Sequence, residues 1–295
     1  MSTEHHQTTR ILGSFLLLLG IPGLYFNIAA SLHFLTIPKT SFYILCLSKT
    51  ISNSITILFH LVYVAPCGIL YTILAPINWD KFINHFVSYG IYIIGPLTQS
   101  FISINRFLVV YFSPTNVPSY SNLVTVAFLS IFWIIGTEMV FLFPDECKLT
   151  LVLNPFTWDR DVCDDEVLLM FNDYYLVLVF FLAIFSNCSN LMTVFKLLGT
   201  AKTRKLSSEA SRRRHASTIR LFIQSCLQDG IYILDMFNGY LVLLVTDANP
   251  IPMFLVTLGS SLMIHEIDGF VMYIFNCNGG KERKVSVVTV VKRIS

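Results

Sequence analysis

The tripeptide Asn105-Arg106-Phe107 places a guanidinium group near the end of a long apolar run. An arginine at the end of a hydrocarbon-length helix is costly unless it snorkels to the membrane interface or finds a partner. Arg106 is therefore either a snorkelling flank of a membrane helix or a functional residue. Its place at the inner end of the third of seven predicted spans favours the functional role.

Polar residues inside the apolar runs form a second group that could do chemistry. Its members are Asn27, Asn53, Asp229, His265 and Asp268. Each is expensive in lipid and should face other helices. At about 1.5 Å of rise per residue, Asn27, Asn53 and Asp268 lie near or just below the middle of their spans. His265 is either a pH sensor, since histidine titrates near physiological pH, or a structural polar contact.

A third group lies toward the outer ends of the predicted spans and in the outer loops. It comprises Trp79, Glu138, Trp158, Asp235 and Asn238. Asp235 and Asn238 are three residues apart and so share one helix face. These residues are candidates for a ligand cavity between helices, although outer polar residues also occur as interfacial anchors. We expect no metal site, cofactor or enzymatic activity, because His265-Glu266 lacks the second histidine of a zinc motif.

The elements that must position these residues follow from composition. The chain has 295 residues, of which 54% are hydrophobic and 13% charged, whereas soluble domains carry about 25% charged residues. Seven apolar runs meet the requirement of about 20 residues for a membrane-spanning helix. They are Ile11–Leu35, Phe42–Ala65, Phe82–Phe112, Tyr120–Phe143, Asn172–Leu198, Thr218–Val245 and Met253–Cys277. The sequence thus predicts an all-α membrane protein with a seven-helix bundle over 11–277.

The positive charges give the orientation. Apart from Arg10, Lys81, Lys148 and Arg160, we assign all Lys and Arg residues, Lys49 among them, to one side of the membrane. The positive-inside rule then places the N-terminus outside, with residues 1–10 as an extracellular tail and 278–295 as a basic cytoplasmic tail. The basic loop 199–217 can bind anionic lipid or a cytoplasmic partner protein.

Two cysteines, Cys147 and Cys163, fall in the outer loop between the fourth and fifth spans, where disulfides persist. A bridge between them would hold this acidic loop over the mouth of the bundle. Cys67 is a competing partner, and the sequence leaves the connectivity open. Cys277 is a palmitoylation candidate or an ordinary thiol.

Arg106 at the inner end of the third span, together with the topology, resembles the rhodopsin-like receptor architecture. More closely, the chain resembles the nematode serpentine receptor class X family of chemosensory receptors. The motifs that carry this resemblance are Phe42-Tyr43, Leu45-Cys46, Asn105-Arg106-Phe107, the cysteines Cys147 and Cys163 around Trp158, Gln224, Gln228, His265 and Asp268-Gly269.

The resemblance implies a receptor of the plasma membrane, in a sensory cilium, that binds an odorant or pheromone. Its partners would be a heterotrimeric G protein, engaged through Asn105, Arg106 and Phe107, and membrane lipids, with no nucleic acid. Pairing with itself or another receptor stays open. Related receptors hold an aspartate on helix two opposite an asparagine on helix seven. Asn53 and Asp268 are the swapped pair and should share a hydrogen bond; ordinary interhelical bonding is the alternative.

The chain departs from the rhodopsin-like pattern where Lys81 takes the place of the usual helix-three cysteine and where the sixth span lacks proline. The alternative functions are a ligand-gated channel or a transporter of the sensory membrane. A transporter should show matched halves with paired broken helices, which this sequence lacks. An insect-type odorant channel would have its N-terminus inside, which the charge distribution opposes.

Overall fold

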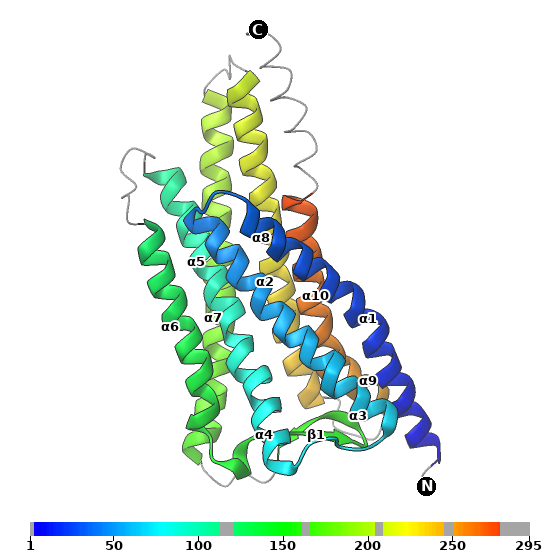
Figure 1. Ribbon diagram of the computed structural model, residues 1–295. Coiled ribbons are helices and arrows are strands. Elements are labelled where there is room, and N and C mark those ends of the chain that lie inside the picture. The colour runs from blue at the N-terminus through cyan, green and yellow to red at the C-terminus, as the bar shows by residue number, and fades with distance from the viewer. Residues whose placement is uncertain (1–2, 113–120, 161–165, 204–208, 245–249, 278–295) are drawn as a thin grey trace.

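A computed structural model describes residues 3–112, 121–160, 166–203, 209–244 and 250–277. The described helices group into seven rods, which run roughly side by side (Figure 1). Two rods are single helices in the first half of the chain, α1 (Thr3–Thr36) and α6 (Ser121–Leu142). Two more are the long helices α7 (Glu166–Thr203) and α8 (Glu209–Leu244). The seven-helix bundle predicted from the sequence is therefore confirmed.

The other three rods are helices interrupted by a π-helical turn. The second rod is α2 (Ser41–Phe59), η1 (His60–Val64) and α3 (Ala65–Leu70). The third is α4 (Ile77–His85), η2 (Phe86–Ile91) and α5 (Tyr92–Tyr111), and the seventh is α9 (Pro250–Phe254), η5 (Leu255–Gly259) and α10 (Ser260–Asn276). Such π turns rotate the side chains that follow them and are frequent at functional sites.

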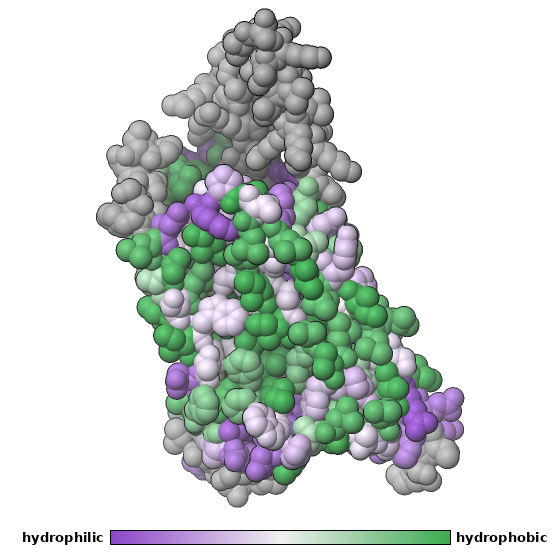
Figure 2. Space-filling view, viewed as in Figure 1, coloured by the Kyte–Doolittle hydropathy of each residue, from purple (hydrophilic) through white to green (hydrophobic). Residues whose placement is uncertain are grey.

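Hydropathy explains which parts of the rods cross the membrane. Within the described residues, six rods are long and apolar enough to span a bilayer by length and composition, and α8 is the seventh rod that misses this threshold. The first part of α8 carries Arg212, Arg213, Arg214 and Arg220, and its second part carries buried polar groups. Apolar residues cover most of the visible side of the bundle, and polar residues collect toward its two ends (Figure 2).

The inward faces of the rods are more polar than a soluble core. In α2 the buried side chains include Ser48, Lys49, Ser52, Asn53 and Thr56, while Ile51 and Leu58 are exposed. This pattern is expected in lipid, where apolar side chains gain nothing by leaving the hydrocarbon and polar ones must find partners. The sequence positions that can do chemistry are thereby gathered in the middle of the bundle.

The third and fourth rods approach at a pair of glycines. A Cβ atom on Gly90 would lie 2.4 Å from the carbonyl oxygen of Gly136, and one on Gly136 would lie 2.5 Å from that of Gly90. Only glycine allows this backbone contact. The indole N–H of Trp133 donates to Ser48 at 3.0 Å, which fastens α6 to α2 as well.

A hairpin lies across the outer end of the bundle, between α6 and α7 in sequence (Figure 1). It consists of the short turn η4 (Asp145–Cys147) and the antiparallel strands β1 (Leu149–Leu153) and β2 (Phe156–Arg160), paired so that Leu151 faces Trp158. Phe156 is fully buried and stacks on Phe254 of α9. The sequence predicted an outer loop here but not its strands.

Candidate functional site

A buried ion pair occupies the centre of the bundle. The Lys49 ammonium lies 2.8 Å from the carboxylate of Asp268, and both side chains are almost wholly inaccessible to solvent. Lys49 also donates to Oε1 of Gln99 on α5 at 2.7 Å. The expectation that Lys49 is one of the inner-side positive charges is wrong, because Lys49 lies two turns into α2 on the inward face and pairs with a carboxylate inside the bundle.

The Asp268 carboxylate accepts from three donors, two on the second rod and one on the sixth. Besides Lys49, its carboxylate accepts from Asn53 Nδ2 on α2 at 2.6 Å and from Gln228 Nε2 on α8 at 2.7 Å. The predicted hydrogen bond between Asn53 and Asp268 is confirmed. A charge that is both paired and fully hydrogen-bonded is the form in which a membrane interior tolerates it.

His265 extends the same network toward α1. Its Nδ1 lies 2.9 Å from Asn53 Oδ1, and because an amide oxygen only accepts, the histidine is the donor. Asn27 Nδ2 donates to the carbonyl oxygens of His265 at 3.1 Å and Gly23 at 2.9 Å. A Cβ on Gly269 would lie 2.1 Å from Asn27 Nδ2, so glycine at 269 is what lets Asn27 reach α10. These contacts favour the structural role for His265.

Asp229 belongs to a second network, which ties α8 to α7 and α5. Its carboxylate accepts from Ser186 Oγ at 2.9 Å and from Asn190 Nδ2 at 2.7 Å. Ser103 of α5 joins both partners, with oxygens 2.5 Å apart at Ser186 and a bond of 2.9 Å from Asn190. The five predicted polar-core residues thus divide between two neighbouring clusters that meet on α5 and α8.

Arg106 lies at the inner end of these clusters. Its guanidinium donates through Nη1 to the hydroxyl of Ser225 on α8 and stacks over the ring of Phe42 on α2, 4.7 Å from the centroid. Phe107 stacks on Tyr111 one turn later. Arg106 is therefore half-buried and contacts two other rods, which distinguishes it from a snorkelling flank.

The outer candidates are dispersed. Asp235 accepts a hydrogen bond from the hydroxyl of Tyr92 on α5 and is half-buried, as is Asn238. Glu138 is exposed on the outward face of α6, and Trp79 is 60% exposed at the start of α4. Neither lies with Asp235 inside the bundle.

The Tyr92–Asp235 bond lies beside Tyr232, which like Tyr92 was not predicted from the sequence, and beside the predicted residue His265. The rings of Tyr232 and His265 each meet Tyr92 edge to face at about 6.5 Å. The Tyr232 hydroxyl and His265 Nε2 are buried, and the described residues offer neither of them a hydrogen-bond partner. The signal that could have found this group is the spacing of Tyr232 and Asp235 on one face of α8.

The outer hairpin is anchored by Asp80. Its carboxylate accepts from the hydroxyl of Tyr63 at 2.5 Å, from Asn84 Nδ2 at 2.7 Å and from the backbone N–H of Leu151 in β1 at 3.1 Å. Asn84 in turn accepts from the indole N–H of Trp158 in β2 at 3.1 Å. Trp158 is thus an anchor of the hairpin, and hydrogen bonds from the start of the third rod hold both strands.

The cysteines agree in part with expectation. Cys147 is disulfide-bonded, whereas Cys67 is a free thiol, so the competing pairing of Cys147 with Cys67 does not occur. Cys163 lies outside the described residues, as does the whole basic tail 278–295, and the pairing of Cys147 with Cys163 stays a prediction. Cys277 is also a free thiol.

The Lys148 ammonium, 2.8 Å from Asp145, lowers the pKa of that exposed carboxyl.

Replacing Asp80 by alanine is expected to release the hairpin. The buried donors that lose their acceptor cost about 1–3 kcal/mol each. Hydrogen exchange at the β1 amides, followed by mass spectrometry, should accelerate while exchange in the spans is unchanged. Asp145→Ala is the matched control, because its exposed ion pair contributes little. Unchanged exchange at Leu149–Leu153 in the Asp80 variant would show that the hairpin is held otherwise.

The bundle and its buried polar centre define a seven-transmembrane protein of the rhodopsin-like fold. The crystal structure of squid rhodopsin superposes with a TM-score of 0.67 at 15% identity, over 93% of this chain and 80% of that one. The chain belongs to the family of serpentine type 7TM GPCR chemoreceptors Srx, whose sequence profile matches residues 17–276. A comparison with curated proteins finds no match. The predicted family is confirmed, and the chain is a multi-pass membrane protein of a non-enzymatic receptor family.

Proposed function

We propose that this receptor binds an external small molecule, an odorant or pheromone, and activates a heterotrimeric G protein at the plasma membrane of a chemosensory cell. The observation that carries the proposal is the Tyr92–Asp235 bond with the Tyr232 and His265 rings beside it. These groups come from the third, sixth and seventh rods. A ligand that contacts all three favours one of their packings over another.

The chemistry of this group limits the ligand. The Tyr232 hydroxyl and His265 Nε2 are buried without a partner among the described residues, and a ligand with one polar group would supply one. Tyr92 and Tyr232 also belong to two apolar clusters that contain aliphatic side chains. A compact, largely apolar molecule with a hydrogen-bonding group fits this set of side chains.

The inner half supports the signalling step. Arg106 connects the third rod to Ser225 on the sixth and to Phe42 on the second. Parting of the third and sixth rods would free the guanidinium for a G protein. The basic residues Arg212, Arg213 and Arg214 at the start of α8 are proposed to contact the G protein or the anionic lipid around it.

A panel of odorants applied to cells that express the chain, with calcium as the readout, tests the proposal. We expect at least one compound to give a response that requires a heterotrimeric G protein. Tyr92→Phe and Asp235→Asn should weaken that response about tenfold, the effect of one charged hydrogen bond. Glu138→Gln is the control, because Glu138 is an acidic residue exposed on the side of α6 that faces away from the bundle. This substitution should leave the calcium response unchanged. Ligand-driven ion flux in the absence of G protein would instead indicate a channel or transporter.

A further inference from the structure

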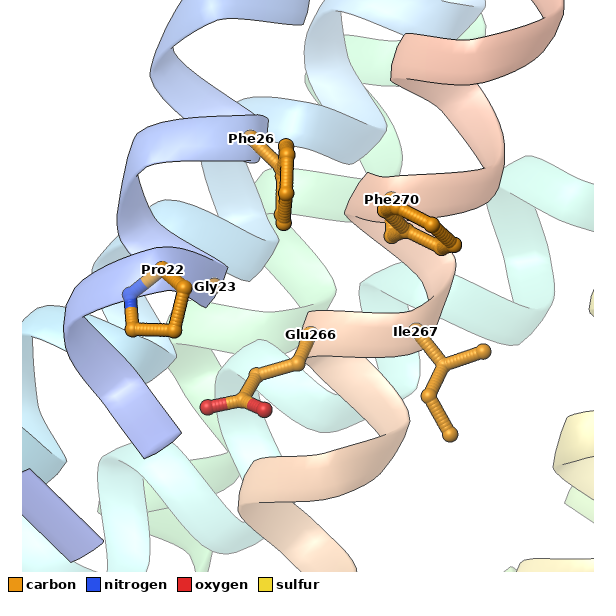
Figure 3. Close-up of a pocket in the computed structure, with 6 residues that line it drawn as sticks. All are labelled: Pro22, Gly23, Phe26, Glu266, Ile267 and Phe270. Carbon is orange, nitrogen blue, oxygen red and sulfur yellow. The ribbon is translucent and has the colours of Figure 1, made fainter. Parts of the chain in front are cut away.

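A groove of about 160 Å³ opens between α1 and α10 on the lateral surface of the bundle. Pro22, Gly23 and Phe26 line it from α1, and Glu266, Ile267 and Phe270 line it from α10 (Figure 3). Ile267 and Phe270 are about 40% exposed, and their neighbours Ile21 and Tyr25 are about 60% exposed. The groove therefore faces the lipid and lies apart from the Tyr92–Asp235 group inside the bundle.

Glu266 is the polar residue among those that line this groove. The carboxylate points from α10 toward Pro22 and Gly23 of α1 (Figure 3). Its Oε1 atom is buried, and the part of the chain that the structure describes supplies no hydrogen-bond partner for it. Every other side chain that lines the groove is apolar. A carboxyl group in such surroundings is among the most expensive side chains to leave unsatisfied.

The α1 side of the groove is built to admit the carboxylate. A Cβ on Gly23 would lie 2.3 Å from Cγ of Glu266, so only glycine leaves room for this side chain. Pro22 lies inside α1, and because proline has no N–H it cannot donate to the carbonyl of Leu18 one turn earlier. The groove thus presents the Glu266 carboxylate, which accepts hydrogen bonds, among side chains that cannot donate one.

We propose that this groove binds a small lipid-soluble alcohol, which donates its hydroxyl hydrogen to Glu266 and packs its apolar body against the rings of Phe26 and Phe270. These two rings meet edge to face at 5.0 Å and close one end of the groove. The volume matches a compact molecule, since an apolar cavity of about 150 Å³ holds benzene. A hydroxyl hydrogen suits the unpartnered Oε1 atom of Glu266. A molecule dissolved in the bilayer can reach this site laterally from the lipid.

Two photoreactive probes of nearly equal shape test this site on the full-length receptor in lipid nanodiscs. They are 4-(trifluoromethyl-diazirinyl)benzyl alcohol and its 4-methyl analogue, which lacks only the hydroxyl oxygen, with adducts mapped by mass spectrometry. We expect the alcohol to label 22–26 and 266–270 about fivefold more than the methyl analogue does, the effect of one hydrogen bond. Excess unlabelled benzyl alcohol should suppress this labelling.

Variants distinguish a hydrogen bond to the probe's hydroxyl group from non-specific apolar binding in the groove. Glu266→Leu and Gly23→Ala should abolish the preference for the alcohol, whereas Glu266→Gln, which keeps an acceptor, should retain part of it. Gly20→Ala is the matched control, because the atoms nearest to its added Cβ belong to the flexible side chain of Leu61, which can shift, and not to Glu266. A monodisperse elution profile qualifies each variant as folded.

Equal labelling by the two probes, or an alcohol preference that survives Glu266→Leu, would overturn the proposal. Labelling that falls as the number of receptors per disc rises would overturn it too, because the groove would then be an interface with a second copy of the chain. None of these three results depends on the odorant response of the receptor.

Discussion

Replacing Lys49 by methionine is expected to destabilise the receptor by about 3–5 kcal/mol, the usual cost of removing one partner from a buried ion pair. Methionine fills much of the same space but leaves the Asp268 carboxylate without its countercharge. The measurement is thermal unfolding of purified receptor in detergent, followed by a thiol-reactive dye, together with surface expression. A large fall in Tm and retention inside the cell are the expected results.

Two further variants make this prediction specific. Lys49→Met combined with Asp268→Asn removes both charges and keeps an acceptor for Asn53 and Gln228, so it should recover most of the lost stability. Lys39→Met is the control lysine, because Lys39 is exposed and only donates to carbonyl oxygens at the end of α1. If Lys49→Met and Lys39→Met were equally mild, the central ion pair would not carry the stability we ascribe to it.

Arg106→Ala is expected to abolish ligand-driven signalling without loss of receptor from the cell surface. The guanidinium makes its contacts at the inner end of the bundle, on α8 and α2, so its removal spares the central networks. Calcium or cAMP responses to an activating odorant, normalised to surface label, give the measurement. Normal signalling by this variant would remove Arg106 from the coupling role.

Ser225→Ala tests the contact of Arg106 with the sixth rod separately from its proposed role in coupling to a G protein. Loss of the hydroxyl weakens the contact between the third and sixth rods but keeps the arginine, so basal signalling should rise about tenfold, the worth of one charged hydrogen bond. Ser130→Ala is the matched control, since that exposed hydroxyl bonds only to the carbonyl of Val126 on its own helix. Basal activity that is unchanged in Ser225→Ala would show that this contact does not hold the resting state.

The spans could be predicted from sequence because the hydrocarbon layer imposes length and hydropathy on each of them. Their ends could not. The helix of α7 continues to Thr203, five residues beyond the predicted end at Leu198, and α4 begins at Ile77, five residues before the predicted start at Phe82. Polar turns extend helices without altering the apolar run, so hydropathy does not register them.

The polar centre was found only in part, for a related reason. Asn53 and Asp268 stand out as polar residues deep in apolar runs, and their bond was predictable. Lys49 lies closer to the end of its run, where a lysine is ordinarily interfacial, so its sequence position suggested a loop-side charge. Its partner Gln99 and the Tyr92–Asp235 contact depend on how separate rods are rotated. The sequence of a single chain does not show directly how its helices are rotated relative to one another.

The glycine contact between Gly90 and Gly136 and the Trp133–Ser48 bond make the second, third and fourth rods a fixed frame. Motion is then left to the last rods, and α8 has the leverage for it. From Asp229 to its first residue, Glu209, this helix runs about 30 Å, beyond the two hydrogen-bonded clusters. A small tilt about Asp229 would therefore sweep the arginine-rich tip through a much larger arc on the side of the cell interior.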